Sequence, residues 1–219
     1  MRRKIGASYN GNGKTEFTVW APLKNKVEVI FKDRSSVALT KDSLGYWVKE
    51  VSGISEGSYY KFRLDEKEDF PDPASRYQPL GVHSWSAIVN QNSFSWNDSS
   101  WKGISLDQMV IYELHIGTFT SDGTFEAVIN KLDHLLELGI NCIEILPISQ
   151  FPGDRNWGYD GVYPFAAQES YGGPEGLKKM IDACHQKGMA VILDTVYNHM
   201  GPEGNYLSQF GPYFTEKYQ

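Results

Sequence analysis

The chain has 219 residues, a formal net charge of -6 and a sequence pI of about 5.4. This acidic balance argues against nucleic acid and anionic membranes as partners. Hydrophobic residues make up 41% of the chain, yet no uninterrupted apolar run reaches membrane-spanning length. The basic N-terminus MRRKIGASYN lacks the apolar segment of a signal peptide. We therefore expect a cytoplasmic protein with one large domain or two small ones.

Short runs of β-forming residues follow one another from residue 15 to residue 89. Turn-forming sequences such as Gly11-Asn12-Gly13 separate them, and the charged run Asp65–Asp69 is expected to be a solvated hairpin tip. Strands at this spacing are typical of an immunoglobulin-like β-sandwich. We assign residues 1–90 to this domain and expect it to fold independently. The expected strands are Glu16–Trp20, Lys26–Phe31, Val37–Leu39, Tyr46–Val51 and Ser58–Leu64.

Two segments without strand or helix patterns follow. Phe70–Ser86 contains four prolines and glycines between Pro71 and Val82, which predicts an ordered loop. Residues 91–108 are polar and are expected to be the linker between two domains. We expect the indoles of Trp96 and Trp101 to anchor this linker to both domains.

From Met109 onward the hydrophobic period predicts a β-α-β-α-β order and hence a parallel sheet. Apolar residues recur at helical spacing from Phe125 to Leu136, and a second helix begins at Pro174. A long loop, Ser149–Gly173, is expected between the second strand and this second helix. A TIM (β/α)8 barrel typically needs about 250 residues, so we expect residues 109–219 to be its first three β/α units, a truncated barrel. A flavodoxin-like open sheet is the alternative, although no Gly-rich phosphate loop is present. The expected strands are Met109–Phe119, Cys142–Ile148 and Ala190–Thr195.

The cysteine and aromatic content says less about fold and function than the hydrophobic pattern does. Cys142 and Cys184 each lie in a predicted core segment, so we expect both to be buried apolar residues and not a disulfide framework. Six Trp and thirteen Tyr suit sugar binding, because ring faces stack on pyranose rings, but they suit an ordinary core equally well.

Polar residues gather directly after the third predicted strand. The apolar run Ala190–Leu193 predicts a strand buried on both faces. Asp194, Tyr197, Asn198 and His199 then place a carboxylate, a phenol, an amide and an imidazole at its C-terminal end. Any one of these residues is more often structural. Four together, where α/β folds bind their ligands, predict a site.

Two motifs carry a resemblance to the α-amylase clan of glycoside hydrolases. Leu193–His199, LDTVYNH, resembles its strand-three signature, and Trp157-Gly158-Tyr159 resembles its loop after strand two. The resemblance implies that Tyr159 stacks on the sugar, that Asp194 braces the site and that His199 binds sugar hydroxyls. Trp157, Asp160 and Asn198 complete the substrate-binding set that the resemblance implies.

The same resemblance raises the question of a metal. Asn198 matches a position that binds calcium in many amylases. Calcium takes six to eight oxygen ligands, and no clustered carboxylates accompany Asn198 in the sequence. We therefore expect neither a metal nor a cofactor.

Four stretches together are most similar to the malto-oligosyltrehalose trehalohydrolase family. That likeness implies hydrolysis of the α-1,4-glucosidic bond that releases trehalose from maltooligosyl trehalose, by a retaining mechanism with two carboxyl groups about 5–5.5 Å apart. The clan carries both groups on later strands, so we expect them beyond Gln219 and expect this chain alone to be inactive. Glu113 and Glu144 are expected to be internal polar partners. The stretches are Pro71–His83, Tyr112–Phe125, Phe151–Val162 and Gly201–Thr215.

Two alternatives remain open. The chain could come from a 1,4-α-glucan branching or debranching enzyme, although the proline-free segment Thr195-Val196-Tyr197-Asn198 disfavours a branching enzyme. It could also be a non-catalytic module that only binds α-glucan. In each case the expected partner is an α-1,4-glucan or maltooligosyl trehalose.

Overall fold

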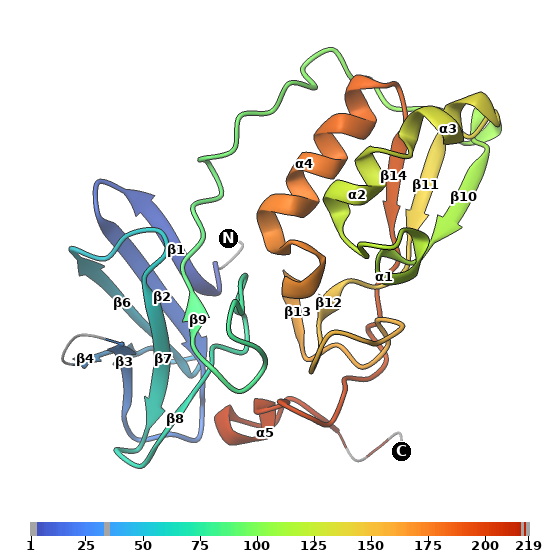
Figure 1. The fold of residues 1–219 in the computed structure, drawn as a ribbon. Helices are drawn as coiled ribbons and strands as arrows, with labels where there is room; N and C mark the ends of the chain where they lie inside the picture. The colour runs from blue at the N-terminus through green and yellow to red at the C-terminus, as the bar shows by residue number, and fades with distance from the viewer. Residues whose placement is uncertain (1–3, 33–35, 216, 218–219) are drawn as a thin grey trace.

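The structure is a computed structural model that describes residues 4–32, 36–215 and 217, arranged as two halves joined by an extended linker (Figure 1). The first three residues of the basic N-terminal segment lie outside the described residues. Within the part that the structure describes, no helix is both long and apolar enough to cross a membrane.

The N-terminal half is a sandwich of two antiparallel sheets, as expected. One sheet has the order β1-β2-β6-β5, and the other has the order β4-β3-β7-β8 with β9 added beside β7. All five expected strands are confirmed, with ends that differ by one or two residues, while β1, β5, β8 and β9 were not predicted. The strands are β1 (Gly6–Gly11), β2 (Lys14–Trp20), β3 (Val27–Phe31), β4 (Val37–Ala38), β5 (Thr40–Lys41), β6 (Tyr46–Ser52), β7 (Tyr59–Leu64), β8 (Glu68–Phe70) and β9 (Ser86–Ala87).

Alternation along β7 shows how the sandwich core forms. Tyr60, Phe62 and Leu64 are buried and their neighbours in the strand are not, because successive side chains of a strand point to opposite faces. Each such buried side chain contributes about 1.5–3 kcal/mol through loss of contact with water. After Leu64 the chain turns through Asp65 and Glu66, both at positive φ, into β8. The expected hairpin tip is confirmed.

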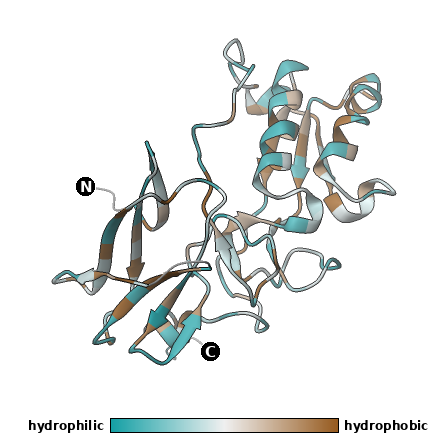
Figure 2. Ribbon diagram, turned by 60° about the vertical axis from the view of Figure 1, so that its left-hand side comes forward, coloured by the Kyte–Doolittle hydropathy of each residue, from teal (hydrophilic) through white to brown (hydrophobic). Residues whose placement is uncertain are grey.

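The C-terminal half contains a three-stranded parallel sheet in the order β10-β11-β14. Three helices cover one face of it (Figure 1), and Figure 2 shows their outer turns as largely hydrophilic. This is the β/α order that the sequence predicts. The elements are β10 (Ile111–Leu114), α2 (Phe125–Ile129), α3 (Leu132–Glu137), β11 (Cys142–Ile145), α4 (Gly173–Gln186) and β14 (Ala190–Leu193).

The two faces of this sheet differ in chemistry. Ile143 and Ile145 face the helices and are buried in a core with residues such as Phe125 and Met180. On the other face, Glu113 of β10 lies directly beside Glu144 of β11. Side chains at such in-register positions share a face, so this face carries two neighbouring carboxylates.

Two predictions about the first β/α unit were wrong. The first strand does not run from Met109 to Phe119: β10 ends at Leu114, and Ile116–Phe119 forms the helical turn α1. The carbonyl of His115 accepts from the amides of Thr118 and Phe119, which closes that turn. The single predicted helix is two helices, because the backbone turns at Asn130 and Lys131 between α2 and α3.

The loop expected from residue 149 to residue 173 also contains structure. β12 (Ser149–Gln150) pairs with β13 (Tyr163–Ala167) as an antiparallel ribbon, and the 3-10 turn η2 (Glu169–Tyr171) follows. The strands β11 and β14 end two or three residues earlier than expected. β14 is not buried on both faces: Leu193 is 46% exposed, because β14 is the outer strand of the sheet in the described residues.

The linker contacts the C-terminal half through one of its two indoles. Trp101 stacks on His185 of α4, with ring centroids 4.9 Å apart and an interplanar angle of 12°. Asp98 Oδ2 lies 2.7 Å from His185 Nδ1 in the same contact. The ring contact of Trp96 is with Phe94, inside the linker. Trp101 is therefore an anchor of the linker on the C-terminal half, and the role expected of Trp96 stays a prediction. A short 3-10 turn, η1 (Leu106–Gln108), ends the linker.

The loop Phe70–Ser86 is ordered by a buried polar network centred on Asp72. Asp72 Oδ2 accepts from the Tyr60 hydroxyl at 2.6 Å, and Oδ1 accepts from the Ala74 amide at 2.8 Å. The Asp72 amide donates to Ser86 Oγ at 3.0 Å. Burial raises the pKa of the Asp72 carboxyl to about 6, although its hydrogen bonds and Arg76 oppose the shift. The prediction of an ordered loop is confirmed.

The C-terminal segment returns to the sandwich. Helix α5 (Leu207–Phe210) lies beside it (Figure 1), and Phe210 is fully buried in the sandwich core. The Phe210 ring contacts Phe62 and Phe70 with centroids 6.3 and 6.1 Å apart. Residues far apart in the sequence thus complete one core.

Candidate functional site

Two loops meet at the C-terminal end of the parallel sheet and bring three of the predicted residues together. The Tyr159 hydroxyl donates to Asp194 Oδ2 at 3.4 Å; Tyr159 lies between β12 and β13, in the connection that follows β11. His199 Nε2, from the loop after β14, donates to the backbone carbonyl of Tyr159 at 2.8 Å. Since both strands run in the same direction, their loops leave the same edge of the sheet.

The other three predicted residues lie on the same two loops. Asn198 Oδ1 is 3.2 Å from His199 Nδ1. Asp160 Oδ2 accepts from the Asn156 side-chain amide at 3.0 Å. Trp157 is 63% exposed, with its ring 4.9 Å from that of His115. Tyr197, also singled out in the sequence, is 86% exposed.

A glycine allows the loop between β12 and β13 to pass close to Pro147, which follows β11. Gly158 has φ +96°, and a Cβ on it would lie 1.9 Å from the carbonyl oxygen of Pro147. Neither the dihedral nor the space suits any other residue. The Gly158 amide donates to Asn156 Oδ1 at 2.8 Å, which holds the turn that presents Tyr159.

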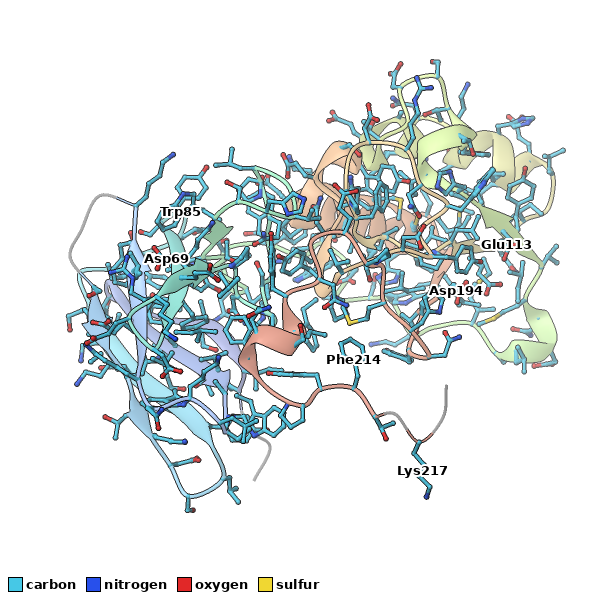
Figure 3. The ribbon with its side chains drawn as sticks, turned by 90° about the horizontal axis from the view of Figure 1, so that it is seen from below. Asp69, Trp85, Glu113, Asp194, Phe214 and Lys217 are labelled. Atoms are coloured by element: carbon cyan, nitrogen blue, oxygen red, sulfur yellow. The ribbon has the colours of Figure 1, made fainter. Side chains whose placement is uncertain are left out.

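The site is acidic. Loss of contact with water raises the pKa of the Tyr159 phenol, and the Asp194 carboxylate, its hydrogen bond, and the charges of Glu113 and Glu144 raise it further. Figure 3 shows Glu113 and Asp194 on the same side of the C-terminal half. Tyr159 therefore stays protonated and can donate a hydrogen bond. A site of carboxylates suits hydroxyl donors and disfavours anions.

The surroundings of Asn198 bear on the question of a calcium ion. Calcium prefers six to eight oxygen ligands, whereas the near neighbour of Asn198 is an imidazole nitrogen. In the described ranges, no three His, Cys, Asp or Glu side chains gather into a group that could hold a metal ion.

One residue of the site was missed in the sequence. His115 directly follows β10 and is only 8% exposed. Its Nε2 donates to the Asn156 carbonyl at 2.8 Å and lies 3.0 Å from the Tyr171 hydroxyl, while Nδ1 accepts from Thr118 Oγ1 at 3.1 Å. His115 therefore ties the Tyr159 loop to the scaffold. The rule that singled out Asp194, a polar residue directly after a buried strand, applies to His115 as well.

The two halves of the chain match two known families of domains. Residues 4–92 match carbohydrate-binding module 48, the isoamylase N-terminal domain, and residues 89–219 match the catalytic domain of alpha amylase. The second match covers more than half of the chain.

Individual proteins show the same likeness. The malto-oligosyltrehalose trehalohydrolase of Saccharolobus solfataricus is 52% identical over 98% of this chain. A 1,4-alpha-glucan branching enzyme of Pseudoalteromonas atlantica is 33% identical over 90% of it. These matches span 38% and 30% of the two relatives, so the chain corresponds to about a third of their length. A crystal structure of a putative alpha amylase from Salmonella typhimurium, 41% identical, superposes on all of this chain and 37% of its own with a TM-score of 0.94.

Proposed function

The chain belongs to the α-amylase family of glycoside hydrolases, and from this premise we propose that the protein carrying it releases trehalose from maltooligosyl trehalose. The reaction is hydrolysis of the α-1,4-glucosidic bond next to the terminal trehalose unit. The observation that carries the proposal is the 52% identity with a trehalohydrolase across nearly the whole chain, against 33% with a branching enzyme. The proline-free segment between Asp194 and His199 agrees with it.

The geometry supports substrate-binding roles for three residues. Tyr159 is 42% exposed, so its ring is free to stack on a sugar while its hydroxyl is held by Asp194. His199 is exposed and has Nε2 committed to the Tyr159 carbonyl, which orients the ring beside the same sugar. Asp194 braces Tyr159. Trp157, Asp160 and Asn198 are proposed to extend this binding surface.

The bond-breaking carboxyls are proposed to lie outside these 219 residues. A retaining mechanism needs a nucleophile and a general acid on opposite sides of the bond, about 5–5.5 Å apart. Glu113 and Glu144 are side by side on one sheet face, which suits polar partners inside a barrel, and Asp194 is engaged with Tyr159. A polypeptide of these 219 residues alone is thus expected to hydrolyse neither starch nor maltooligosyl trehalose.

The test is an assay of the complete natural protein. We expect trehalose release from maltooligosyl trehalose and much slower release of glucose from maltoheptaose. New α-1,6 linkages formed from amylose would instead identify a branching enzyme. Trehalose release by the 219-residue polypeptide, abolished by Asp194→Asn, would contradict the proposed placement of the catalytic carboxyls.

A second candidate is an α-glucan-binding module without catalysis. The match of residues 4–92 to a carbohydrate-binding module favours it. Binding of maltoheptaose by the complete protein with no product formed would support that reading. A cytoplasmic location is proposed with either function, since both cysteines are free and buried, and cell fractionation would test it.

A further inference from the structure

A cavity of about 700 Å³ lies between the sandwich and the C-terminal half. This volume is within the usual range of small-molecule sites, roughly 300–1,000 Å³. Its walls come from β2, from β13, from the loop after β14 and from the C-terminal segment. Both halves of the chain therefore build it.

Aromatic rings dominate the lining. Phe165 of β13 and Phe214 of the C-terminal segment are each 55% exposed, so their faces are open to a ligand. The remaining rings of the lining are Trp20, Tyr46, Tyr197 and Tyr213. Open ring faces suit a ligand that is apolar on its flat sides, as a pyranose ring is.

The C-terminal wall is held in place by the sandwich. The Tyr213 hydroxyl donates to the Trp20 carbonyl at 2.9 Å, and the two rings meet edge to face at 5.0 Å. The Trp20 indole in turn donates to the Leu44 carbonyl at 3.1 Å. Figure 3 shows Phe214 on this segment, between the sandwich and the side that carries Asp194. A wall fixed before binding lowers the entropy cost of taking up a ligand.

The cavity is built for an uncharged ligand. The described residues that line it include no Lys or Arg. Its one carboxylate, Asp72, is fully buried, and both oxygens already accept hydrogen bonds, from Tyr60 and Ala74. The lining also includes the uncharged polar side chains of Asn198 and Thr215, which can exchange hydrogen bonds with hydroxyl groups. A phosphorylated or acidic ligand would find neither a lysine nor an arginine among these residues.

The cavity adjoins the candidate site through two shared residues. Asn198 and His199 line it, and His199 also contacts Tyr159. We propose that the cavity binds further glucose units of the α-1,4-glucan chain whose end occupies the Tyr159 site, with Phe165 and Phe214 as stacking surfaces. The inference rests on the proposed function in taking the substrate to be an α-glucan. It gives the sandwich a direct part in holding that substrate.

The test is titration calorimetry of the complete natural protein with maltoheptaose. Phe214→Ala and Phe165→Ala are each expected to raise Kd about tenfold through loss of one stacking surface. Phe214→Tyr keeps the ring and should retain most of the affinity. Leu138→Ala is the matched control: Leu138 is 62% exposed at the end of α3, away from the cavity lining, and its Kd should equal that of the wild type.

A further variant and a parallel assay distinguish ring stacking from simple apolar contact and from the trehalohydrolase function. Phe214→Leu retains apolar surface without a ring, so wild-type affinity in that variant would show that the cavity makes only apolar contacts and would overturn the proposal. Unchanged Kd in both alanine variants would overturn it as well. Trehalose release is measured in parallel. If the protein releases trehalose but its affinity for maltoheptaose does not depend on Phe214, only this inference is refuted. If the affinity depends on Phe214 but no trehalose is released, only the trehalohydrolase function is refuted.

Discussion

The imidazole of His199 donates to the backbone carbonyl of Tyr159 at 2.8 Å, which joins the loops after two neighbouring strands. The Tyr159 hydroxyl adds a second link, to Asp194 at 3.4 Å. The position of the Tyr159 ring therefore depends on the loop after β14 as well as on its own. A sugar stacked on this ring would contact a surface fixed from two sides.

Substitutions at Tyr159 separate the ring from its hydroxyl. Tyr159→Ala removes the proposed stacking surface and should weaken maltoheptaose binding by the complete protein about tenfold or more. Tyr159→Phe keeps the ring and loses only the long, exposed hydrogen bond to Asp194. We expect calorimetry to show a much smaller change for Phe. Equal losses in the two variants would mean that the hydroxyl, and not the ring, binds the sugar.

Two glycines of the Tyr159 loop form a matched pair. Both have positive φ, but a Cβ at Gly158 would lie 1.9 Å from the Pro147 carbonyl, whereas a Cβ at Gly153 meets nothing within 4 Å. Gly153→Ala should cost about 1–2 kcal/mol from backbone strain alone. Gly158→Ala should lower the free energy of unfolding by at least about 2 kcal/mol more than Gly153→Ala does, because the backbone must shift. Urea denaturation measures both, and equal costs would show that the close approach to Pro147 is not maintained in solution.

The buried carboxyl of Asp72 predicts a pH dependence. Its folded pKa of about 6 is higher than its ordinary value of 3.8 because burial disfavours the charge. The folded state thus holds the proton more tightly, so this contribution to stability is full below pH 3.8 and is lost as the pH rises through about 6. The loss is about 3 kcal/mol at 1.36 kcal/mol per pKa unit. Relative to Asp72→Asn, the wild type should become less stable by about this amount between pH 4 and pH 7.

Asp65 provides a control of opposite sign. Partial burial acts against its charge, but the amides of Asn25 and Lys26 donate to Oδ1 at 2.8 and 3.0 Å and lower its pKa overall. Its stabilisation is present at neutral pH and is lost as the pH falls, so Asp65→Asn should destabilise at pH 7 more than at pH 3. Denaturation curves of wild type and Asp72→Asn that stay parallel from pH 4 to pH 7 would contradict the prediction for Asp72.

Phe210 makes the stability of the sandwich depend on a distant segment. Its side chain is fully buried between Phe62 and Phe70, and Phe→Ala at such a site costs about 3–5 kcal/mol. Phe210→Ala should therefore lower the urea midpoint of the sandwich. Leu138→Ala, exposed on α3, should leave it unchanged.

The same contact bears on whether the sandwich folds independently. Residues 4–90 expressed alone lack Phe210, so their unfolding midpoint should be lower than that of the same region in the full chain. Limited proteolysis of the linker should still leave a protected N-terminal fragment as long as the C-terminal segment stays bound to it. Equal stability of the isolated and intact sandwich would show that Phe210 contributes little.

The local sequence pattern alone predicted much of the secondary structure and the position of the candidate site. A run of β-forming residues predicted β7, Pro174 marked the start of α4, and the polar residues after Leu193 predicted a site at the end of β14. These features depend on residues close in sequence, whose period and dihedral preferences are set by their own side chains. The family resemblance of Leu193–His199 is of the same kind, since it is carried by one short segment.

Only the tertiary structure decided which distant residues share a surface. Nothing local distinguishes Phe210 from the apolar residues of an ordinary helix, yet it completes the sandwich core because α5 returns to that domain. The contact of His115 with Asn156, and the cavity shared by Phe165 and Phe214, arise in the same way. The end of β10 at Leu114 is a further example. The sequence of residues 116–119 predicts a strand, but the chain forms a helical turn there, where Gly117 packs against Tyr171. Such contacts are set by how whole elements pack, and packing energy depends on partners that a local pattern does not contain.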